Sequence, residues 1–239
     1  MKILSIGNSF SQDAQRYLHR LAKHDDVQIK TVNLMIGGCT LRTHYLNMLD
    51  DNARYGFEFN GEATGLLVSI RQALVSDDWD YVTLQQASPK SPDYATYTPY
   101  LQELAAYVKK YCPNAKILIH ETWGYENGSK HLQNVQYESM SAMFADVKES
   151  YKKAAQAISA EKIISSGTAL LTAAQNGLTH THRDGLHVSY GAGRYLVALT
   201  WYKTLTGNDI TNNDFNDFDE PVSDEERKII IDAVQSATR

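Results

Sequence analysis

Apolar and polar positions follow two patterns that alternate along the chain. Short apolar runs rich in β-branched residues predict strands, and they lie at residues 1–6, 27–36, 80–85, 116–119 and 162–165. Longer stretches with apolar residues at helical spacing predict helices, and they lie at residues 11–25, 41–49, 66–75, 100–111, 190–205 and 223–237, with a further long helix ending near residue 160. Such alternation is typical of a parallel sheet covered by helices on both faces. We therefore predict an α/β fold, a three-layer α/β/α sandwich with a central parallel sheet of about five strands.

No feature of the sequence divides this sandwich into separate domains. Residues 50–65 carry few periodic apolar positions and are expected to form an excursion, and the loop at residues 87–99 holds three of the five prolines. The last helix begins at Ser223, which Glu226 follows in a capping-box pattern. A chain of 239 residues that is 43% hydrophobic can bury one sizeable core. We expect residues 1–239 to form a single domain.

Charge and cysteine content narrow the expected partners and location. The 23 basic and 28 acidic residues give a net charge of -5 and are scattered, so we expect neither nucleic acid nor a membrane as a partner. No apolar run approaches the ~18 residues of a membrane span. Cys39 and Cys112 lie far apart, which indicates free thiols in a reducing compartment. No leader precedes the first strand, so we expect a cytoplasmic protein, or a periplasmic or secreted one if Met1 replaced a native export signal.

A serine lies where the first predicted strand passes into the first helix, in the segment Gly7-Asn8-Ser9-Phe10-Ser11. In open α/β sheets ligands bind at the carboxyl ends of the strands. A helix start also supplies free N–H groups and a partial positive charge, both suited to an oxyanion. Serine before a helix is often only an N-cap, and Ser11 fits that role better because it lies nearer the first periodic residue. Ser9 is therefore the candidate nucleophile.

A base and a group to orient it occur together near the other end of the chain, in Asp184-Gly185-Leu186-His187. Serine is a weak nucleophile near neutral pH, so it needs a base whose tautomer is fixed by a partner. If the loop folds as one turn, Asp184 can bind the Nδ1 hydrogen of His187 and leave Nε2 to accept the Ser9 proton. An isolated motif of this kind can equally be a surface loop with a capping aspartate.

Taken together, these segments resemble the SGNH (GDSL-like) hydrolase superfamily, which carries a Gly-x-Ser block at the first strand and a DxxH block near the C-terminus. With two further blocks, Gly37-Gly38-Cys39-Thr40 and residues 80–86, they look more closely like a bacterial branch catalogued as DUF4886. The resemblance extends from residue 1 to about residue 207. It implies a flavodoxin-like SGNH hydrolase fold and a serine hydrolase that needs no metal or organic cofactor.

The resemblance also implies an oxyanion hole. In the family it combines the N–H of the nucleophilic serine, a glycine N–H after the second strand and an asparagine amide after the third. Ser9 and Gly38 match the first two positions. The third departs from the pattern, because the strand ends in Gln85-Gln86. Gln85 is the preferred donor, since it follows the strand directly, and Gln86 is the alternative.

The loop from His180 to His187 permits a second chemistry. His180, His182, Asp184 and His187 are residue types that ligate zinc. The run differs, however, from the HxHxDH run of binuclear zinc hydrolases by two extra residues before the last histidine. His180 and His182 are then expected at the mouth of the site. Three other residues, His44, Trp123 and Tyr125, are weaker candidates for substrate contact, each with a structural role as an equal or better explanation. Glu121 is a further polar candidate near the same edge, with no role assigned.

The resulting functional hypothesis is a serine esterase that hydrolyses a short acyl ester through an acyl-enzyme intermediate. Relatives with the glutamine variant suggest an O-acetyl group on a carbohydrate, so the expected partner is a small-molecule or saccharide ester. An alternative is a non-catalytic carbohydrate-binding protein on the same fold; the intact Ser9, Asp184 and His187 argue against it. A zinc-dependent hydrolase is the third alternative.

Overall fold

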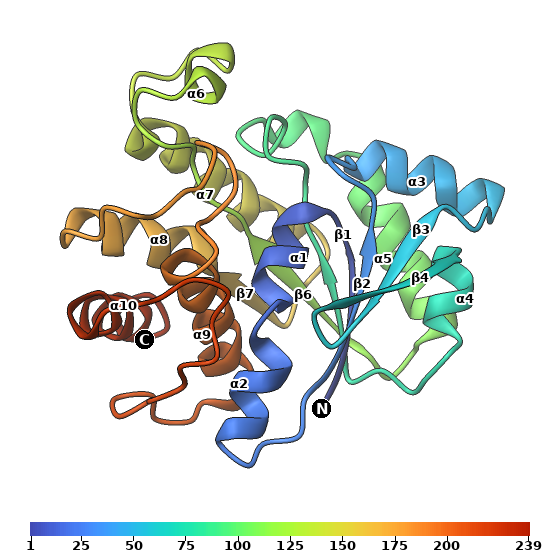
Figure 1. Cartoon of the computed structure of the whole chain (residues 1–239). Helices are drawn as coiled ribbons and strands as arrows, with labels where there is room; N and C mark the ends of the chain where they lie inside the picture. Colours follow the sequence, from blue (N-terminus) through green and yellow to red (C-terminus); the bar gives the residue numbers. More distant parts are fainter.

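The computed structural model describes Met1–Arg239, and its centre is a seven-stranded sheet in the order β4-β3-β2-β1-β5-β6-β7 (Figure 1). Strands β2, β1, β5, β6 and β7 run parallel. The prediction of an α/β fold with about five parallel strands is therefore confirmed. The strands are β1 Lys2–Gly7, β2 Lys30–Met35, β3 Tyr55–Phe59, β4 Glu62–Val68, β5 Tyr81–Leu84, β6 Lys116–Glu121 and β7 Lys162–Ser165.

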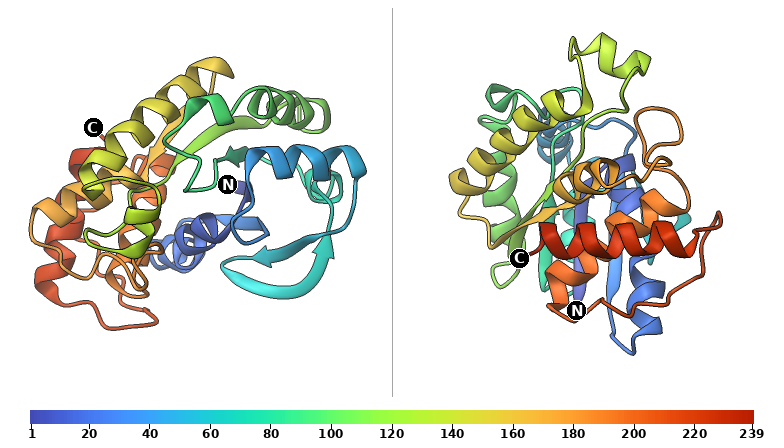
Figure 2. Two further views of the ribbon diagram at one scale, coloured as in Figure 1. Left: turned by 90° about the horizontal axis from the view of Figure 1, so that it is seen from above. Right: turned by 90° about the vertical axis from the view of Figure 1, so that its left-hand side faces the viewer.

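Helices cover both faces of this sheet (Figures 1 and 2). Helices α3, α4 and α5 pack against one another, α1 and α2 pack on α9, and α10 packs across α8 and α9. Helix α7 packs on β6 and β7. The helices are α1 Ser9–Gln15, α2 Leu18–His24, α3 Leu41–Asp50, α4 Ile70–Leu74, α5 Tyr100–Tyr111, α6 Lys130–Asn134, α7 Met140–Ala157, α8 Ser166–Gln175, α9 Ala192–Thr206 and α10 Asp224–Ala237, with a 3-10 turn at Tyr94–Thr96.

The excursion expected after α3 is an antiparallel hairpin, β3–β4, that extends the sheet beyond β2. Its turn is Asn60-Gly61, with φ of 51° and 84°, the positive pair that a tight two-residue hairpin turn requires. Gly61 also lies so close to Arg16 that a Cβ there would be 2.6 Å from the Arg16 carbonyl oxygen. The helix predicted at residues 66–75 was thus wrong at its start, because β4 runs to Val68 and α4 begins at Ile70.

Most other predicted elements are present, with some differences in their bounds. The helix at residues 100–111 and the strand at residues 162–165 match α5 and β7, and the Ser223–Glu226 capping box opens α10 as predicted. The helix predicted at residues 11–25 is two helices, α1 and α2. Helix α8 was not predicted; it follows β7 with no intervening loop.

One continuous hydrophobic core of 60 buried residues fills the space between the layers. One polar pair lies inside the sheet: the hydroxyls of Ser5 and Thr83 on the neighbouring strands β1 and β5 lie 2.7 Å apart. None of the helices has the length and apolar character needed to span a membrane. The carboxyl ends of the central strands lie at the upper edge of the sheet in Figure 1, on the side from which the segment that carries α6 projects.

Candidate active site

The turn from β1 into α1 is built around Asn8. Asn8 is the N-cap, and its side-chain oxygen accepts the N–H of Phe10 at 2.9 Å. The hydroxyl of Ser11 accepts the Asn8 N–H at 3.0 Å. The prediction that Ser11 is the N-cap was therefore wrong: Ser11 lies inside the helix and reciprocates the cap. Gly7 makes this possible, because a Cβ there would be 1.9 Å from Ser11 Oγ.

Ser9, Asp184 and His187 meet in the structure. His187 Nε2 lies 2.8 Å from Ser9 Oγ, and its Nδ1 lies 2.8 Å from Asp184 Oδ2. The loop folds as a single turn because Asp184 Oδ1 accepts the N–H groups of Leu186 and His187, at 3.0 and 2.7 Å. Gly185 has φ of 80° within this turn, which a residue without a Cβ adopts at little cost. This is the geometry of a nucleophile, a base and an orienting carboxylate.

The environment of Asp184 keeps its carboxylate charged. Partial burial raises the pKa of Asp184, but the hydrogen bonds from the His187 backbone and ring and from the Leu186 backbone outweigh that effect and lower the pKa to about 2. A charged carboxylate holds the hydrogen of His187 on Nδ1, so that Nε2 is the atom free to accept a proton from Ser9.

Two stacked aromatic side chains, Phe10 and Trp123, contact the loop that carries His187. The ring of Trp123 stacks on that of Phe10 with centroids 4.1 Å apart and planes 3° from parallel. Trp123 Nε1 donates to the carbonyl oxygen of Leu186 at 3.0 Å, and Phe10 meets His187 edge-on at 5.6 Å. Trp123 is fully buried, so it contacts the loop and does not offer its face to a substrate.

An ion-pair cluster ties the nucleophile helix to the His187 loop. Asp13, on α1 one turn after Ser9, has a fully buried side chain. It accepts from Arg183 Nη1 at 3.1 and 2.9 Å and from Arg194 Nε at 2.8 Å. Because Arg183 directly precedes Asp184 in the chain, this contact fixes the position of the loop relative to Ser9.

A cavity of about 490 Å³ opens beside Ser9 and His187. Gly37 and Gly38 lie on its wall, and their backbone N–H groups donate to no acceptor in the protein. Ser9 is the first residue of α1, where N–H groups have no partner within the helix. The cavity is lined by Asn8, Ser9, Phe10, Gly37, Gly38, Ser88, Pro89, Tyr125, His131, Asn134, Val135, Leu186 and His187.

Neither Gln85 nor Gln86 lines this cavity. The Gln85 amide donates to Asn8 Oδ1 at 2.7 Å, and its oxygen lies 2.7 Å from His120 Nδ1. The Gln86 amide donates to the carbonyl oxygen of Thr96 at 3.1 Å. Both side chains are buried within polar networks, so the structure does not direct either amide toward Ser9. Gln85 instead supports the Asn8 cap.

Of the weaker candidates, only Tyr125 reaches the cavity. His44 is fully buried, with Nδ1 at 2.9 Å from the hydroxyl of Tyr55, and its burial lowers its pKa to about 3. Glu121 is buried as well and accepts from the N–H and hydroxyl of Thr168, both at 2.9 Å. Both residues have structural roles in the core.

The zinc alternative is not supported by the placement of its residues. His182 points inward, with Nε2 at 3.1 Å from the Gly124 carbonyl oxygen, and burial lowers its pKa to about 4. His180 is exposed and lies off the cavity wall. No three histidine, cysteine, aspartate or glutamate side chains are arranged to hold a metal ion. The expectation that His180 and His182 line the mouth of the site was therefore wrong.

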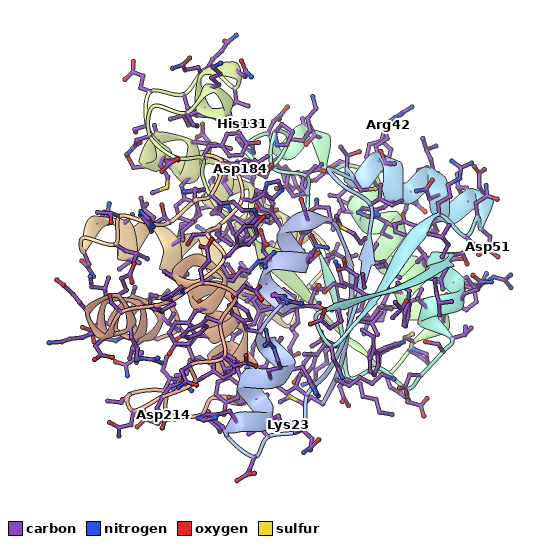
Figure 3. The ribbon with its side chains drawn as sticks, in the orientation of Figure 1. Lys23, Arg42, Asp51, His131, Asp184 and Asp214 are labelled. Atoms are coloured by element: carbon purple, nitrogen blue, oxygen red, sulfur yellow. The ribbon has the colours of Figure 1, made fainter.

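Two wall residues that the sequence did not indicate, His131 and Asn134, lie on the short helix α6. This segment is attached to the His187 loop, because the Glu126 N–H donates to the Gly185 carbonyl oxygen at 3.0 Å. Figure 3 shows His131 above Asp184 in the upper half of the molecule. No sequence signal marked them, since a polar helix of five residues has no distinctive pattern.

Comparison with known families gives one match that covers nearly the whole chain. The family described as "Domain of unknown function (DUF4886)" matches residues 2–237. A crystal structure of a DUF4886 family protein from Bacteroides uniformis is 34% identical, with a TM-score of 0.92 over 99% of this chain and 94% of that one. No protein among the curated sequences matches the chain significantly.

More distant structures share the fold. An SGNH hydrolase candidate from Slackia heliotrinireducens is 25% identical, with a TM-score of 0.62 over 86% of this chain and 98% of that one. A family 3 carbohydrate esterase from Clostridium thermocellum is 14% identical, with a TM-score of 0.51 over 85% and 94% of the two chains. The fold is that of the SGNH hydrolases.

Proposed function

The chain belongs to the DUF4886 family, and from that premise we propose that it is an SGNH-type serine esterase with Ser9 as nucleophile, His187 as general base and Asp184 as the group that orients it. One observation carries the proposal: Ser9 Oγ, His187 and Asp184 form a continuous chain of two 2.8 Å contacts beside an open cavity. A core serine with a packing role would not need an imidazole and a charged carboxylate in line with it.

The proposed reaction proceeds in two halves. His187 Nε2 takes the Ser9 proton as Ser9 Oγ attacks the ester carbonyl, and the N–H groups of Ser9 and Gly38 stabilise the negative oxygen of the tetrahedral intermediate. The intermediate collapses when His187 gives its proton to the leaving alcohol, which leaves an acyl group on Ser9. Water, activated by the same base, then releases the acid and restores Ser9.

We propose a short acyl ester of a carbohydrate, such as an O-acetyl group, as the substrate class. The cavity of about 490 Å³ is large enough for an acetyl group and part of a sugar ring. Its wall mixes the aromatic ring of Tyr125 with the polar side chains of His131 and Asn134, a combination suited to a partly apolar, hydroxyl-rich molecule. The fold shared with a carbohydrate esterase agrees with this choice.

The test is hydrolysis of p-nitrophenyl acetate by the wild type, Ser9→Ala and the control Ser236→Ala, each with and without a chelator. Ser236 is exposed on α10 and its side chain makes no hydrogen bond. We expect chelator-resistant activity in the wild type and Ser236→Ala, and a loss of at least about 10³-fold in Ser9→Ala. Activity that survives Ser9→Ala would refute the nucleophile assignment, and loss on chelation alone would favour a metal-dependent reaction.

A serine-directed phosphonate separates the esterase from a carbohydrate-binding protein on the same fold. The esterase is expected to be labelled at Ser9 even if p-nitrophenyl acetate is a poor substrate, because the phosphonate reports on the nucleophile and its base. A wild-type protein that is neither labelled nor active on acetylated sugars would contradict the esterase proposal. Active preparations can then be compared on a series of acetylated sugars to define the alcohol that is preferred.

A further inference from the structure

The loop after β5 carries a hydroxyl group with no assigned role at the wall of the cavity. Ser88 lies two residues after Gln86, and it lines the same cavity as Ser9 and Gly38. Its hydroxyl accepts a hydrogen bond from the hydroxyl of Tyr125 at 2.9 Å. The structure contains no protein acceptor for the hydrogen that Ser88 itself carries.

The contact with Tyr125 orients the Ser88 hydroxyl. A serine hydroxyl carries one hydrogen and two acceptor lone pairs. When Tyr125 donates to one lone pair, the serine hydrogen must turn away from the Tyr125 oxygen. Because Ser88 is 8% exposed and borders the cavity, an acceptor placed in the cavity is the partner that can satisfy this hydrogen.

The backbone around Ser88 is held in place by further hydrogen bonds. Ser91 Oγ donates to the Ser88 carbonyl oxygen at 2.9 Å, and the Tyr97 hydroxyl donates to the Ser91 carbonyl oxygen at 2.9 Å. Tyr125 is itself buried. A donor fixed in this way before substrate binds needs little reorganisation in the reaction, which is the property that makes an oxyanion donor effective.

The amides of Gln85, Gln86 and Asn8 are already engaged within the protein, and the remaining amide on the cavity wall, that of Asn134, comes from the α6 segment. Gln85 and Gln86 donate within buried networks, and Asn8, which does border the cavity, donates its amide to the Cys39 carbonyl oxygen at 3.3 Å. None of the amides of Gln85, Gln86 and Asn8 is therefore free to join the backbone donors of Ser9 and Gly38. Ser88 is the hydroxyl on this wall whose hydrogen is unused.

We propose that Ser88 donates the third hydrogen bond to the oxyanion of the tetrahedral intermediate, and that Tyr125 is the positioning residue that directs it. This inference rests on the proposed esterase function. It assigns to a hydroxyl on the loop after β5 the contribution that an asparagine amide makes in related enzymes. Such a hydrogen bond strengthens as negative charge develops on the oxygen, so its loss affects kcat more than KM.

The experiment compares Ser88→Ala, Ser88→Thr and Tyr125→Phe with the wild type and the control Ser236→Ala, after thermal unfolding has shown that each variant is folded. Kinetic constants for p-nitrophenyl acetate and the rate of Ser9 labelling by a phosphonate are measured together. We expect Ser88→Ala to lower kcat by about 10²-fold with KM changed less than about threefold. Ser88→Thr, which keeps the hydroxyl, is expected to recover most of the activity, and Tyr125→Phe to lose about tenfold. Labelling should slow in the same order.

Several outcomes would overturn the assignment of Ser88. One is Ser88→Ala with kcat within threefold of the wild type, and another is a rise in KM alone, which would indicate ordinary ground-state binding. If Ser88→Ala loses stability, Tyr125→Phe decides, because it keeps the aromatic packing and removes only the orienting hydroxyl. Failure of the esterase itself looks different: Ser9→Ala stays active, or the wild type neither turns over nor is labelled, and the inference falls with it.

Discussion

Replacing Asp13 by asparagine tests how the nucleophile helix is joined to the His187 loop. The substitution keeps the shape of the side chain and removes its charge, which leaves Arg183 and Arg194 beside a neutral amide with side chains only 18% and 12% exposed. Removing one partner of a buried ion pair costs about 3–5 kcal/mol. Arg194 retains Asp219 at 2.7 Å, so the uncompensated charge is mainly that of Arg183. We therefore expect a loss of about 3 kcal/mol in the free energy of unfolding.

Urea unfolding of the wild type and Asp13→Asn measures this loss directly. The matched control is Glu149→Gln, which breaks an ion pair with Lys153 at 3.7 Å whose side chains are 55% and 51% exposed. An exposed pair contributes about 0–1 kcal/mol, so the control should unfold almost as the wild type does. A double-mutant cycle with Arg183→Met is expected to give a coupling energy of about 1–3 kcal/mol.

The same variant is expected to lose esterase activity at temperatures where it is still folded. Arg183 precedes Asp184, and without Asp13 the loop is no longer anchored to α1, so the 2.8 Å contact between His187 and Ser9 is formed in a smaller share of molecules. A stability loss below about 1 kcal/mol, or a coupling energy near zero, would refute the reasoning. Either result would mean that the cluster contributes no more than a surface pair.

Three further predictions concern other parts of the fold. Hydrogen bonds, chiefly from Arg16, lower the pKa of Asp219 from 3.8 to about 2. The charged Asp219 therefore contributes at most about 2 kcal/mol to the free energy of unfolding, which is present above pH 3.8 and lost as the pH falls through about 2. A difference in unfolding free energy between wild type and Asp219→Asn that does not shrink on acidification would contradict this. Gly38 has φ of 61° with open space around its Cα, so Gly38→Ala should cost only about 1–2 kcal/mol of backbone strain, and a larger fall measured by urea unfolding would indicate a steric clash. Gly167→Ala in α8 should lower the free energy of unfolding by at least about 1–3 kcal/mol, because the new Cβ would lie 2.1 Å from the Thr122 carbonyl oxygen. This is the opposite of the usual preference of helices for alanine over glycine. A raised melting temperature would contradict the close approach of these two backbones.

The strand and helix pattern was predictable wherever periodicity was strong. The α5 sequence Tyr100–Tyr111 places its apolar residues on one face and its lysines in the last turn, so its bounds could be read directly. The β3–β4 hairpin was missed because β4 is an exposed edge strand, with Leu66 and Leu67 more than 60% exposed, and adjacent apolar residues resemble part of a helix. The Asn60-Gly61 dipeptide was the signal available for this turn.

Helix α8 shows a different limit of sequence patterns. It begins at Ser166, immediately after β7 ends at Ser165, so no turn residues separate the two elements. Its sequence, Ser-Gly-Thr-Ala-Leu-Leu-Thr-Ala-Ala-Gln, has small residues on the buried side, and Gly167 packs against Thr122 and Phe144. Close approach of a helix to its neighbours explains these small residues, but that contact exists only after the chain has folded.

The pairing of Asp184 with His187 could be proposed from their spacing, since a turn of that length brings the two side chains together. The roles of Gln85 and Gln86 could not. Their position after β5 indicated the correct edge of the sheet, but the direction of each amide is set by competing partners on other elements, namely Asn8, His120 and Thr96. The same competition made Asn8 the cap in place of Ser11.

The separation of Ser9 and His187 along the chain has a consequence for biosynthesis. The two residues are 178 positions apart, so at about 5–20 residues per second the ribosome needs on the order of ten seconds or more to make His187 after Ser9. During that interval Ser9 lacks the histidine and aspartate that the proposed mechanism requires. On the proposed mechanism, turnover requires that the late segment has closed onto the early one, so the appearance of esterase activity during refolding would report on this long-range step.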